Sequence, residues 1–258
     1  MQLVLQGPIY PETEAIVRSY LELPWIDKII VSCWETCPQL PIRSHRVVVL
    51  HNTPVEFPST GNLNRQIVSS AEGLRYVTAD YAAKMRTDQK LSHAALCLMD
   101  EFFWRFRDGG ARYIDGSGPQ GRICVLGNYT RFPFHPRDHV FWGHTADLRR
   151  LFDVPLSATP WRKEPDFTRV LRPETYIGMH YVARFHPAVR DMLRSPELYL
   201  VDGAPRLREA LAIDQALREQ VFKVFPRVDL EWPKHQLKSY HYHVGERFSE
   251  YWHDQPWR

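Results

Sequence analysis

Leu-Val-Leu-Gln-Gly-Pro at residues 3–8 is an apolar run that ends at a Gly-Pro turn, and it sets the pattern for the first third of the chain. Residues 12–23 follow with apolar side chains at helical spacing, and two more continuous apolar runs occupy residues 29–31 and 47–50. Continuous runs are typical of strands buried on both faces, as in parallel sheets covered by helices. The order strand, helix, strand therefore predicts a doubly wound α/β fold with a mostly parallel sheet and helices on both faces.

Further elements follow along the chain. Residues 62–76 predict a helix, whereas residues 81–85 fit either a strand or the end of a helix. The later patterns predict helices over residues 91–107, 146–152, 174–184 and 205–224, and strands over residues 122–129 and 139–143. We expect a single domain over residues 1–258, whose last part is an α-rich extension.

The composition excludes several classes of protein. Apolar residues make up 44% and charged residues 24% of the 258 residues, which is typical of a globular chain. The net charge of +3 is too small to indicate a nucleic-acid partner. No apolar stretch approaches the roughly 18 residues of a membrane-spanning helix, and the first residues lack the basic region of a signal peptide. We therefore expect a cytoplasmic protein. Cys33 and Cys37 are expected to be free thiols, because no second Cys or His pair follows at a zinc-site spacing.

Residues at the ends of the predicted strands are the first candidates for a site. Ligands of doubly wound sheets bind at the carboxyl ends of the strands. If residues 81–85 form a strand, Lys84, Arg86 and Asp88 share one face at its end. Two cations and a carboxylate there fit a diphosphate bridged by a divalent metal. Spacing alone favours the alternative of a surface salt-bridge ladder.

The start of the predicted helix at residues 62–76 is also polar. Residues 62–66 read Asn-Leu-Asn-Arg-Gln. Backbone amides at a helix N-terminus favour anions, and Arg65 is suited to bidentate contact with phosphate. An ordinary helix cap explains the Asn residues equally well.

Two pairs of side chains in the second half of the chain are weaker candidates. His241 and His243 form a His-x-His pair that suits a metal if it lies on a strand, although surface imidazoles explain it better. Trp142 and His144 fit either a sugar pocket or the core.

A general base has two candidates among the carboxylates. Glu174 follows Pro173 at a predicted helix start and is the first, and Asp138 is the second.

Four short blocks occur in one order along the chain and carry a family resemblance. They read Gln-Gly-Pro at residues 6–8, Ser-Cys-Trp-Glu at 32–35, Asn-Leu-Asn-Arg-Gln at 62–66 and Lys-Met-Arg-Thr-Asp at 84–88. Together they resemble the WavE lipopolysaccharide-synthesis family, from whose second block Cys33 departs, since Thr is more usual there. The resemblance implies a single GT-A-like domain with a Rossmann-like sheet. Its nucleotide-binding half would span residues 1–90, and its acceptor-side half and C-terminal helical extension would span residues 91–258.

The same resemblance implies the activity of a nucleotide-sugar-dependent glycosyltransferase. Such an enzyme moves a sugar from a nucleotide-sugar donor to a glycan or lipid-linked glycan acceptor in lipopolysaccharide or other surface-polysaccharide assembly. The acceptor and the mildly basic chain suggest a peripheral contact with the inner membrane face. A non-catalytic carbohydrate- or nucleotide-binding protein that retains the fold is the alternative. A nucleotidyltransferase is disfavoured, because one Gly and no Lys or Arg follow the first strand before Arg18.

The resemblance also assigns expected roles to residues. The donor is expected to contact Gln6, Gly7, Pro8, Trp34, Glu35, Asn62, Asn64, Arg65, Gln66, Lys84, Arg86 and Asp88. Arg65, Lys84, Arg86 and a divalent metal on Asp88 are expected to stabilise the leaving diphosphate. Glu174 or Asp138 would deprotonate the acceptor in an inverting reaction, and Trp142 and His144 would lie on the acceptor side.

The metal itself is the least settled part of this expectation. The acidic Asp-x-Asp motif that usually holds the metal in the GT-A class falls here on Arg86-Thr87-Asp88, where a cation replaces one carboxylate. Either Asp88 holds Mn²⁺ or Mg²⁺ with help from His241 and His243, or Arg86 and Lys84 replace part of the metal's charge.

Overall fold

A seven-stranded sheet with the order β3-β2-β1-β4-β7-β6-β8 forms the centre of the protein. The computed structural model describes residues 1–108, 114–116, 118–126, 132–159, 166–167, 169–224 and 230–231. The strands of this sheet are β1 (Gln2–Gln6), β2 (Lys28–Trp34), β3 (Val47–Asn52), β4 (Tyr81–Arg86), β6 (Ile123–Val125), β7 (Val140–His144) and β8 (Phe222–Val224). All neighbours pair in parallel except β7, which is antiparallel to both β4 and β6. Two short strands, β5 (Lys90–Leu91) and β9 (Leu230–Glu231), pair with each other outside this sheet.

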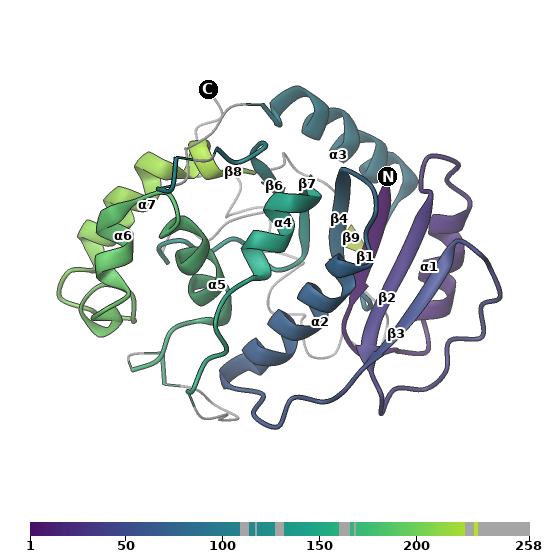
Figure 1. Ribbon diagram of the computed structural model, residues 1–258, viewed down its shortest axis with the longest axis horizontal. Coiled ribbons are helices and arrows are strands. Elements are labelled where there is room, and N and C mark those ends of the chain that lie inside the picture. Colours follow the sequence, from purple (N-terminus) through teal and green to yellow (C-terminus); the bar gives the residue numbers. More distant parts are fainter. Residues whose placement is uncertain are drawn as a thin grey trace.

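Helices cover both faces of the sheet (Figure 1). They are α1 (Thr13–Leu21), α2 (Leu63–Arg75), α3 (His93–Phe106), α4 (Thr145–Phe152), α5 (Pro173–Val182), α6 (Pro187–Met192) and α7 (Leu207–Val221), with the short helical turns η1 (Thr60–Asn62) and η2 (Pro196–Leu198). Side chains alternate along β1, so that Leu3 and Leu5 pack with α1 and α3, whereas Val4 packs with α2 and α4. The predicted α/β class with a mostly parallel, helix-covered sheet is confirmed.

The order of the strands creates a switch point between β1 and β4. The chain moves from β1 to β2 and β3 on one side, and α2 then returns it to β4 on the other side of β1. Gln6 at the end of β1 pairs with Arg86 at the end of β4. The loops that follow these two strands therefore begin side by side at the carboxyl ends of the strands, which is where doubly wound sheets bind ligands.

Two sequence expectations change or become definite in the structure. Residues 81–85, which fitted either a strand or a helix end, lie in β4. The helix predicted over residues 205–224 ends at Val221, and Phe222–Val224 forms β8 beside β6. Phe222 is buried, so pairing and packing at the free edge of β6 outweigh continuation of the helix.

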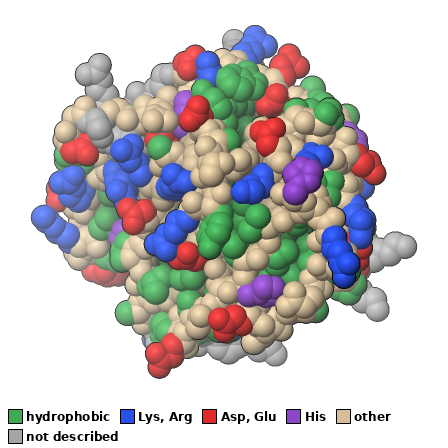
Figure 2. All heavy atoms as spheres, turned by 45° about the vertical axis from the view of Figure 1, so that its right-hand side comes forward, with side chains coloured by type: hydrophobic (Ala, Val, Ile, Leu, Met, Phe, Trp, Pro, Cys, Tyr) green, Lys and Arg blue, Asp and Glu red, His purple; other side chains and the backbone are tan. Residues whose placement is uncertain are grey.

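The surface is mixed in charge. Figure 2 shows Lys and Arg side chains interspersed with Asp and Glu side chains on the face it draws, in keeping with the small net charge of +3. Among the described residues, no helix is long and apolar enough to cross a membrane.

Close packing of α2 against β1 depends on Gly73. A Cβ atom at this position would lie 2.5 Å from Cγ1 of Val4 and 3.1 Å from Cβ of Ser32. Gly73→Ala is therefore expected to lower the free energy of unfolding by about 1–3 kcal/mol, even though Ala favours the helix. Urea unfolding checks this, with Gly118→Ala as the control, because nothing lies within 4 Å of a Cβ at Gly118. Equal stability of the two variants would contradict the close contact.

Candidate active site

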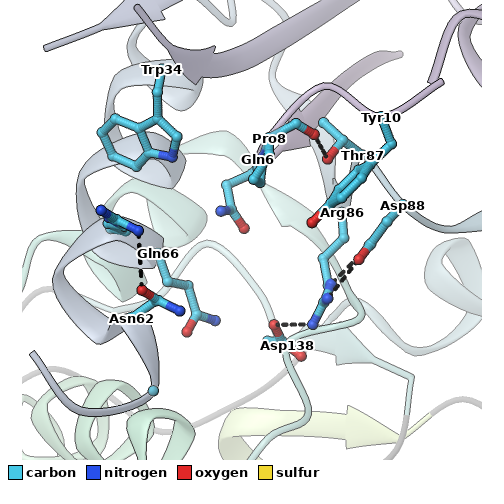
Figure 3. Close-up of a pocket in the computed structure, with 13 residues that line it drawn as sticks. Gln6, Pro8, Tyr10, Trp34, Asn62, Gln66, Arg86, Thr87, Asp88 and Asp138 are labelled. Carbon is cyan, nitrogen blue, oxygen red and sulfur yellow. Dashed lines mark hydrogen bonds and ion pairs between the residues drawn. The ribbon is translucent and has the colours of Figure 1, made fainter. Parts of the chain in front are cut away.

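A pocket of about 260 Å³ lies at the switch point between β1 and β4 (Figure 3). The predicted site residues that line it are Gln6, Gly7, Pro8, Trp34, Asn62, Arg65, Gln66, Arg86, Asp88 and Asp138. Tyr10, Gly61 and Thr87 also line it and were not predicted. The structure therefore brings the four sequence blocks to one cavity.

The loops after β1 and β4 are fixed to each other by Thr87. Its backbone N–H donates to the Gln6 carbonyl at 3.1 Å, and its hydroxyl donates to the Pro8 carbonyl at 2.6 Å. The Thr13 hydroxyl donates to the Thr87 carbonyl at 3.2 Å. Gly7 lies beside this residue at φ 131°, and a Cβ there would be 2.9 Å from the Thr87 hydroxyl oxygen. Thr87 thus shapes the pocket floor, a role that its place between Arg86 and Asp88 does not reveal.

The opposite wall comes from η1 and the first turn of α2. Gly61 and Asn62 both have left-handed backbones, with φ 60° and 59°. The Arg65 guanidinium contacts the Asn62 side-chain oxygen at 3.3 Å. Gln66 is 7% exposed, and its side-chain nitrogen has no hydrogen-bond partner among the residues that the structure describes. Buried polar groups are almost always paired, so Gln66 is suited to receive a ligand oxygen.

Arg86 lies at the centre of a charge cluster on the β4 side (Figure 3). Its guanidinium donates to both oxygens of Asp88 at 2.9 and 2.7 Å, and to Asp138 at 3.3 Å. The Lys84 ammonium donates to the Asp138 carbonyl at 3.0 Å. Burial opposes ionisation of Asp138, but Arg86, His139 and Lys84 outweigh it and hold the pKa of this carboxyl well below its usual range.

Lys84 supports the cluster from below the pocket. Its side chain is fully buried, and its ammonium lies 5.4 Å and 5.5 Å from the ring centres of Phe141 and Phe152. Burial lowers the pKa of Lys84 to about 8, against the attraction of Asp138. The expected donor contact requires Lys84 to line the pocket, and it does not. Lys84 acts on the pocket through Asp138 instead.

Glu174 lies next to the pocket rather than in its wall. It occupies the first turn of α5, and its side chain is 23% exposed. Burial, together with the negative charge of Asp138, raises the pKa of Glu174 to about 7. A carboxyl that ionises near neutral pH is suited to accept a proton, which agrees with its place as first candidate for the base.

His135 is a neighbour of Glu174 that sequence reasoning missed. Its Nε2 lies 3.6 Å from the Glu174 carboxyl, and its Nδ1 contacts the Thr175 hydroxyl at 3.0 Å. Burial and the charge of Arg172 lower the pKa of His135 to about 3, so the ring is neutral at physiological pH. His135 is a single His in the loop before β7, and no local sequence pattern there predicts its contact with Glu174.

Two predicted donor contacts lie elsewhere. Asn64 is 1% exposed, and its side chain contacts the Phe57 carbonyl and both backbone polar groups of Ser157 at 2.8–2.9 Å. It therefore joins two chain segments instead of facing the pocket. Glu35 is exposed, and its carboxyl accepts a hydrogen bond from the Thr53 hydroxyl at 3.0 Å outside the pocket.

The pair predicted for the acceptor side does not line this pocket. Trp142 is fully buried in the core on the α1 and α3 face, where its ring stacks on Trp25 with centroids 6.4 Å apart. His144 pairs with Tyr81, which begins β4, so it lies at the end of the sheet opposite the pocket. The antiparallel direction of β7, which the sequence did not indicate, places His144 there, whereas Trp142 is in the middle of β7 with its ring in the core.

The metal expected on Asp88 has a poor fit among these side chains. Both carboxylate oxygens of Asp88 are bound to Arg86, and its side chain is only 2% exposed. Nowhere in the described part of the chain do three His, Cys, Asp or Glu side chains gather as a metal centre needs. His241 and His243, and the rest of the tail expected to contact a membrane, lie outside the described residues.

The sequence and the chain course of this protein are similar to those of known proteins. A family model described as WavE lipopolysaccharide synthesis matches residues 1–172. None of the curated proteins matches. One similar solved structure is the mannosyltransferase PcManGT from Pyrobaculum calidifontis in complex with GDP-Man and Mn²⁺, with 11% identity over 84% of this chain and 74% of that chain and a TM-score of 0.46. A second is TarS 1–349 from S. aureus, with 10% identity over 98% of this chain and 78% of that chain and a TM-score of 0.46. A third is mouse xyloside xylosyltransferase 1, with 12% identity over 90% of this chain and 97% of that chain and a TM-score of 0.39. At these identities and TM-scores they add nothing on the chemistry of the site.

Proposed function

Because this chain belongs to the WavE lipopolysaccharide synthesis family, we propose that it is a glycosyltransferase that moves a sugar from a nucleotide-sugar donor to a glycan or lipid-linked glycan acceptor. The observation that carries the proposal is the pocket at the β1 and β4 ends, where Arg65, Arg86 and the unpartnered Gln66 amide meet. Residues 1–90 supply most of the donor site, and α5 with the loop before β7 supplies the side that faces the acceptor.

The nucleoside diphosphate is the part of the donor that this pocket suits best. Trp34 and Tyr10 offer aromatic surface for the base, and Gln6 offers an amide beside them. Arg65 offers a guanidinium from the helix α2 side, and Arg86 offers a second from the β4 side. Their positive charge stabilises the diphosphate as the bond to the sugar breaks.

The transfer step follows from the position of Glu174. Its carboxylate takes the proton from an acceptor hydroxyl, and the hydroxyl oxygen forms a bond to the anomeric carbon. The bond from that carbon to the terminal phosphate oxygen breaks, and the electron pair leaves with the nucleoside diphosphate. Attack from the side opposite the leaving group inverts the anomeric configuration.

The ion pair between Arg86 and Asp88 favours the second candidate, a non-catalytic nucleotide- or carbohydrate-binding protein, because it occupies the carboxylate that a catalytic metal would use. The second candidate binds a nucleotide or a carbohydrate without converting it, whereas the transferase converts a nucleotide sugar. Release of nucleoside diphosphate from a nucleotide sugar in the presence of a glycan acceptor separates them.

A thermal-shift panel with UDP, GDP, CDP and CMP tests the proposed donor site. One nucleotide is expected to raise the melting temperature, because it binds the folded state alone. Arg65→Ala is expected to weaken its binding about 10- to 100-fold, the loss of a charge-assisted hydrogen bond. Arg75→Ala is the matched control, since Arg75 lies at the far end of α2 and is paired with Glu72. Equal binding by the two variants, or no shift with any nucleotide, would contradict the proposal.

A further inference from the structure

We propose that the donor diphosphate binds without a divalent cation and that the Arg86 guanidinium takes the place of that cation. The inference rests on the proposed function and deepens it, because it states how the same pocket balances the charge of its substrate. It is carried by the geometry of the cluster of Arg86, Asp88, Asp138 and Lys84.

Asp88 is committed to Arg86 and not to a metal. Two parallel hydrogen bonds of 2.9 and 2.7 Å join one edge of the guanidinium to both carboxylate oxygens. The Asp88 side chain is 2% exposed, so little of these oxygens is accessible to a cation in the pocket. Arg86 already supplies the counter-charge of Asp88 and Asp138, so a divalent cation on Asp88 would lie beside this positive charge and be repelled by it.

Arg86 has the properties that the substitution requires. A guanidinium keeps its charge at all physiological pH values and presents planar donors that match phosphate oxygens. Asp88 holds its plane from one direction, and Asp138 contacts it at 3.3 Å from another. The positive charge is therefore held in a fixed position before the donor arrives, as electrostatic stabilisation of a leaving group requires.

Two further cations offset the carboxylates of the cluster. Lys84 is fully buried behind Asp138, and its ammonium donates to the Asp138 carbonyl at 3.0 Å. Arg65 faces the pocket from α2. Arg65, Lys84 and Arg86 outnumber Asp88 and Asp138, and they still equal the carboxylates in number when Glu174 is ionised, so an anionic diphosphate meets no net negative charge here.

Calorimetric titration of the full chain with UDP, GDP, CDP and CMP tests the proposal. Each titration is run in EDTA and again with Mn²⁺. We expect the dissociation constant of the nucleotide that binds to change by less than about threefold, a small effect on the scale of a tenfold change per 1.4 kcal/mol. Binding that is at least tenfold tighter with Mn²⁺ would overturn this inference alone. No binding in either buffer would overturn the proposed function and this inference with it.

The conservative variant Arg86→Lys distinguishes the effect of the planar guanidinium group from the effect of its positive charge. It keeps one positive charge but cannot bind both Asp88 oxygens and a phosphate through a planar fork. Nucleotide affinity in EDTA is expected to fall about tenfold or more, and Mn²⁺ is not expected to restore it. Arg75→Lys on α2 is the control. Restoration by Mn²⁺ to the wild-type affinity would show that Asp88 is a metal ligand and would overturn the proposal. The wild-type titration above decides the question even if Arg86→Lys does not fold.

Discussion

Replacement of Glu174 by Gln is expected to lower the rate of sugar transfer by about 10²- to 10⁴-fold, the usual contribution of a general base. Gln has the shape of Glu but cannot accept a proton. The nucleotide affinity is expected to remain near that of the wild type, because Glu174 lies beside the donor pocket and does not line it. Turnover of the nucleotide sugar measures the first quantity, and calorimetry measures the second.

The pH dependence of the rate gives an independent measure of the same role. The base acts when it is ionised, and burial raises the pKa of Glu174 to about 7. The wild-type kcat/KM is therefore expected to rise with pH up to about 7, and Glu174→Gln is expected to lose this rise. Glu72→Gln, a change on the outer side of α2, is the control. Wild-type turnover in Glu174→Gln would exclude the residue as the base.

Stability distinguishes loss of the base from loss of the fold. The pKa of Glu174 is higher in the folded protein than in the unfolded chain, where it is near the ordinary value of 4.5. The protonated form therefore favours folding, and this stabilisation is lost as pH rises from the unfolded to the folded pKa. At pH 8 the ionised carboxylate costs the wild type stability. Glu174→Gln is thus expected to melt at or above the wild-type temperature at that pH.

Replacement of Asn64 by Ala is expected to destabilise the protein by about 3 kcal/mol or more, since each unmade buried hydrogen bond costs about 1–3 kcal/mol. The side chain contacts one backbone carbonyl at Phe57 and two backbone groups at Ser157. All three groups would lose their partner. For a chain of this size the melting temperature is expected to fall by about 6–12 °C.

Asn64 and Asn62 form a matched pair for this measurement. Asn62 lines the pocket, lies at φ 59° and contacts Arg65. Asn62→Gly is expected to keep the stability, since Gly adopts a left-handed backbone freely, and to weaken nucleotide binding. Asn64→Ala is expected to lower the stability and to leave nucleotide binding by the folded protein unchanged. Weaker nucleotide binding with unchanged stability in Asn64→Ala would return this residue to the donor site.

The sequence predicted the positions of the strand ends well, because local patterns determine them. Residues 3–8 and 29–31 identify parallel strands by their continuous apolar runs, and the strands end where the pocket begins. The alternation of a strand also placed Lys84, Arg86 and Asp88 on one side. Which of these three side chains faces the pocket depends on how deeply each is buried. The burial of Lys84 between Phe141 and Phe152 results from packing against segments that are distant in the sequence.

The other residues that do not line the pocket are placed by long-range contacts as well. Asn64 is indistinguishable from a helix cap or a ligand contact until residue 157 folds against it, 93 residues later. Trp142 was expected on the acceptor side because aromatic residues suit sugars, but its side chain lies on the face of β7 that packs in the core with α1 and α3. Strand direction and side-chain depth are properties of the assembled sheet, and one chain's local pattern does not contain them.

The contact of Thr87 with the loop after β1 has a consequence for synthesis of the chain. The hydrogen bond from the Thr87 hydroxyl to the Pro8 carbonyl joins residues 79 positions apart. The contact of Arg86 with Asp138 joins residues that are 52 positions apart. Strand β1 thus carries half of a pocket whose other half follows much later in the chain. A chain that stops before Asp138 lacks the second carboxylate that holds Arg86, so its pocket is not assembled.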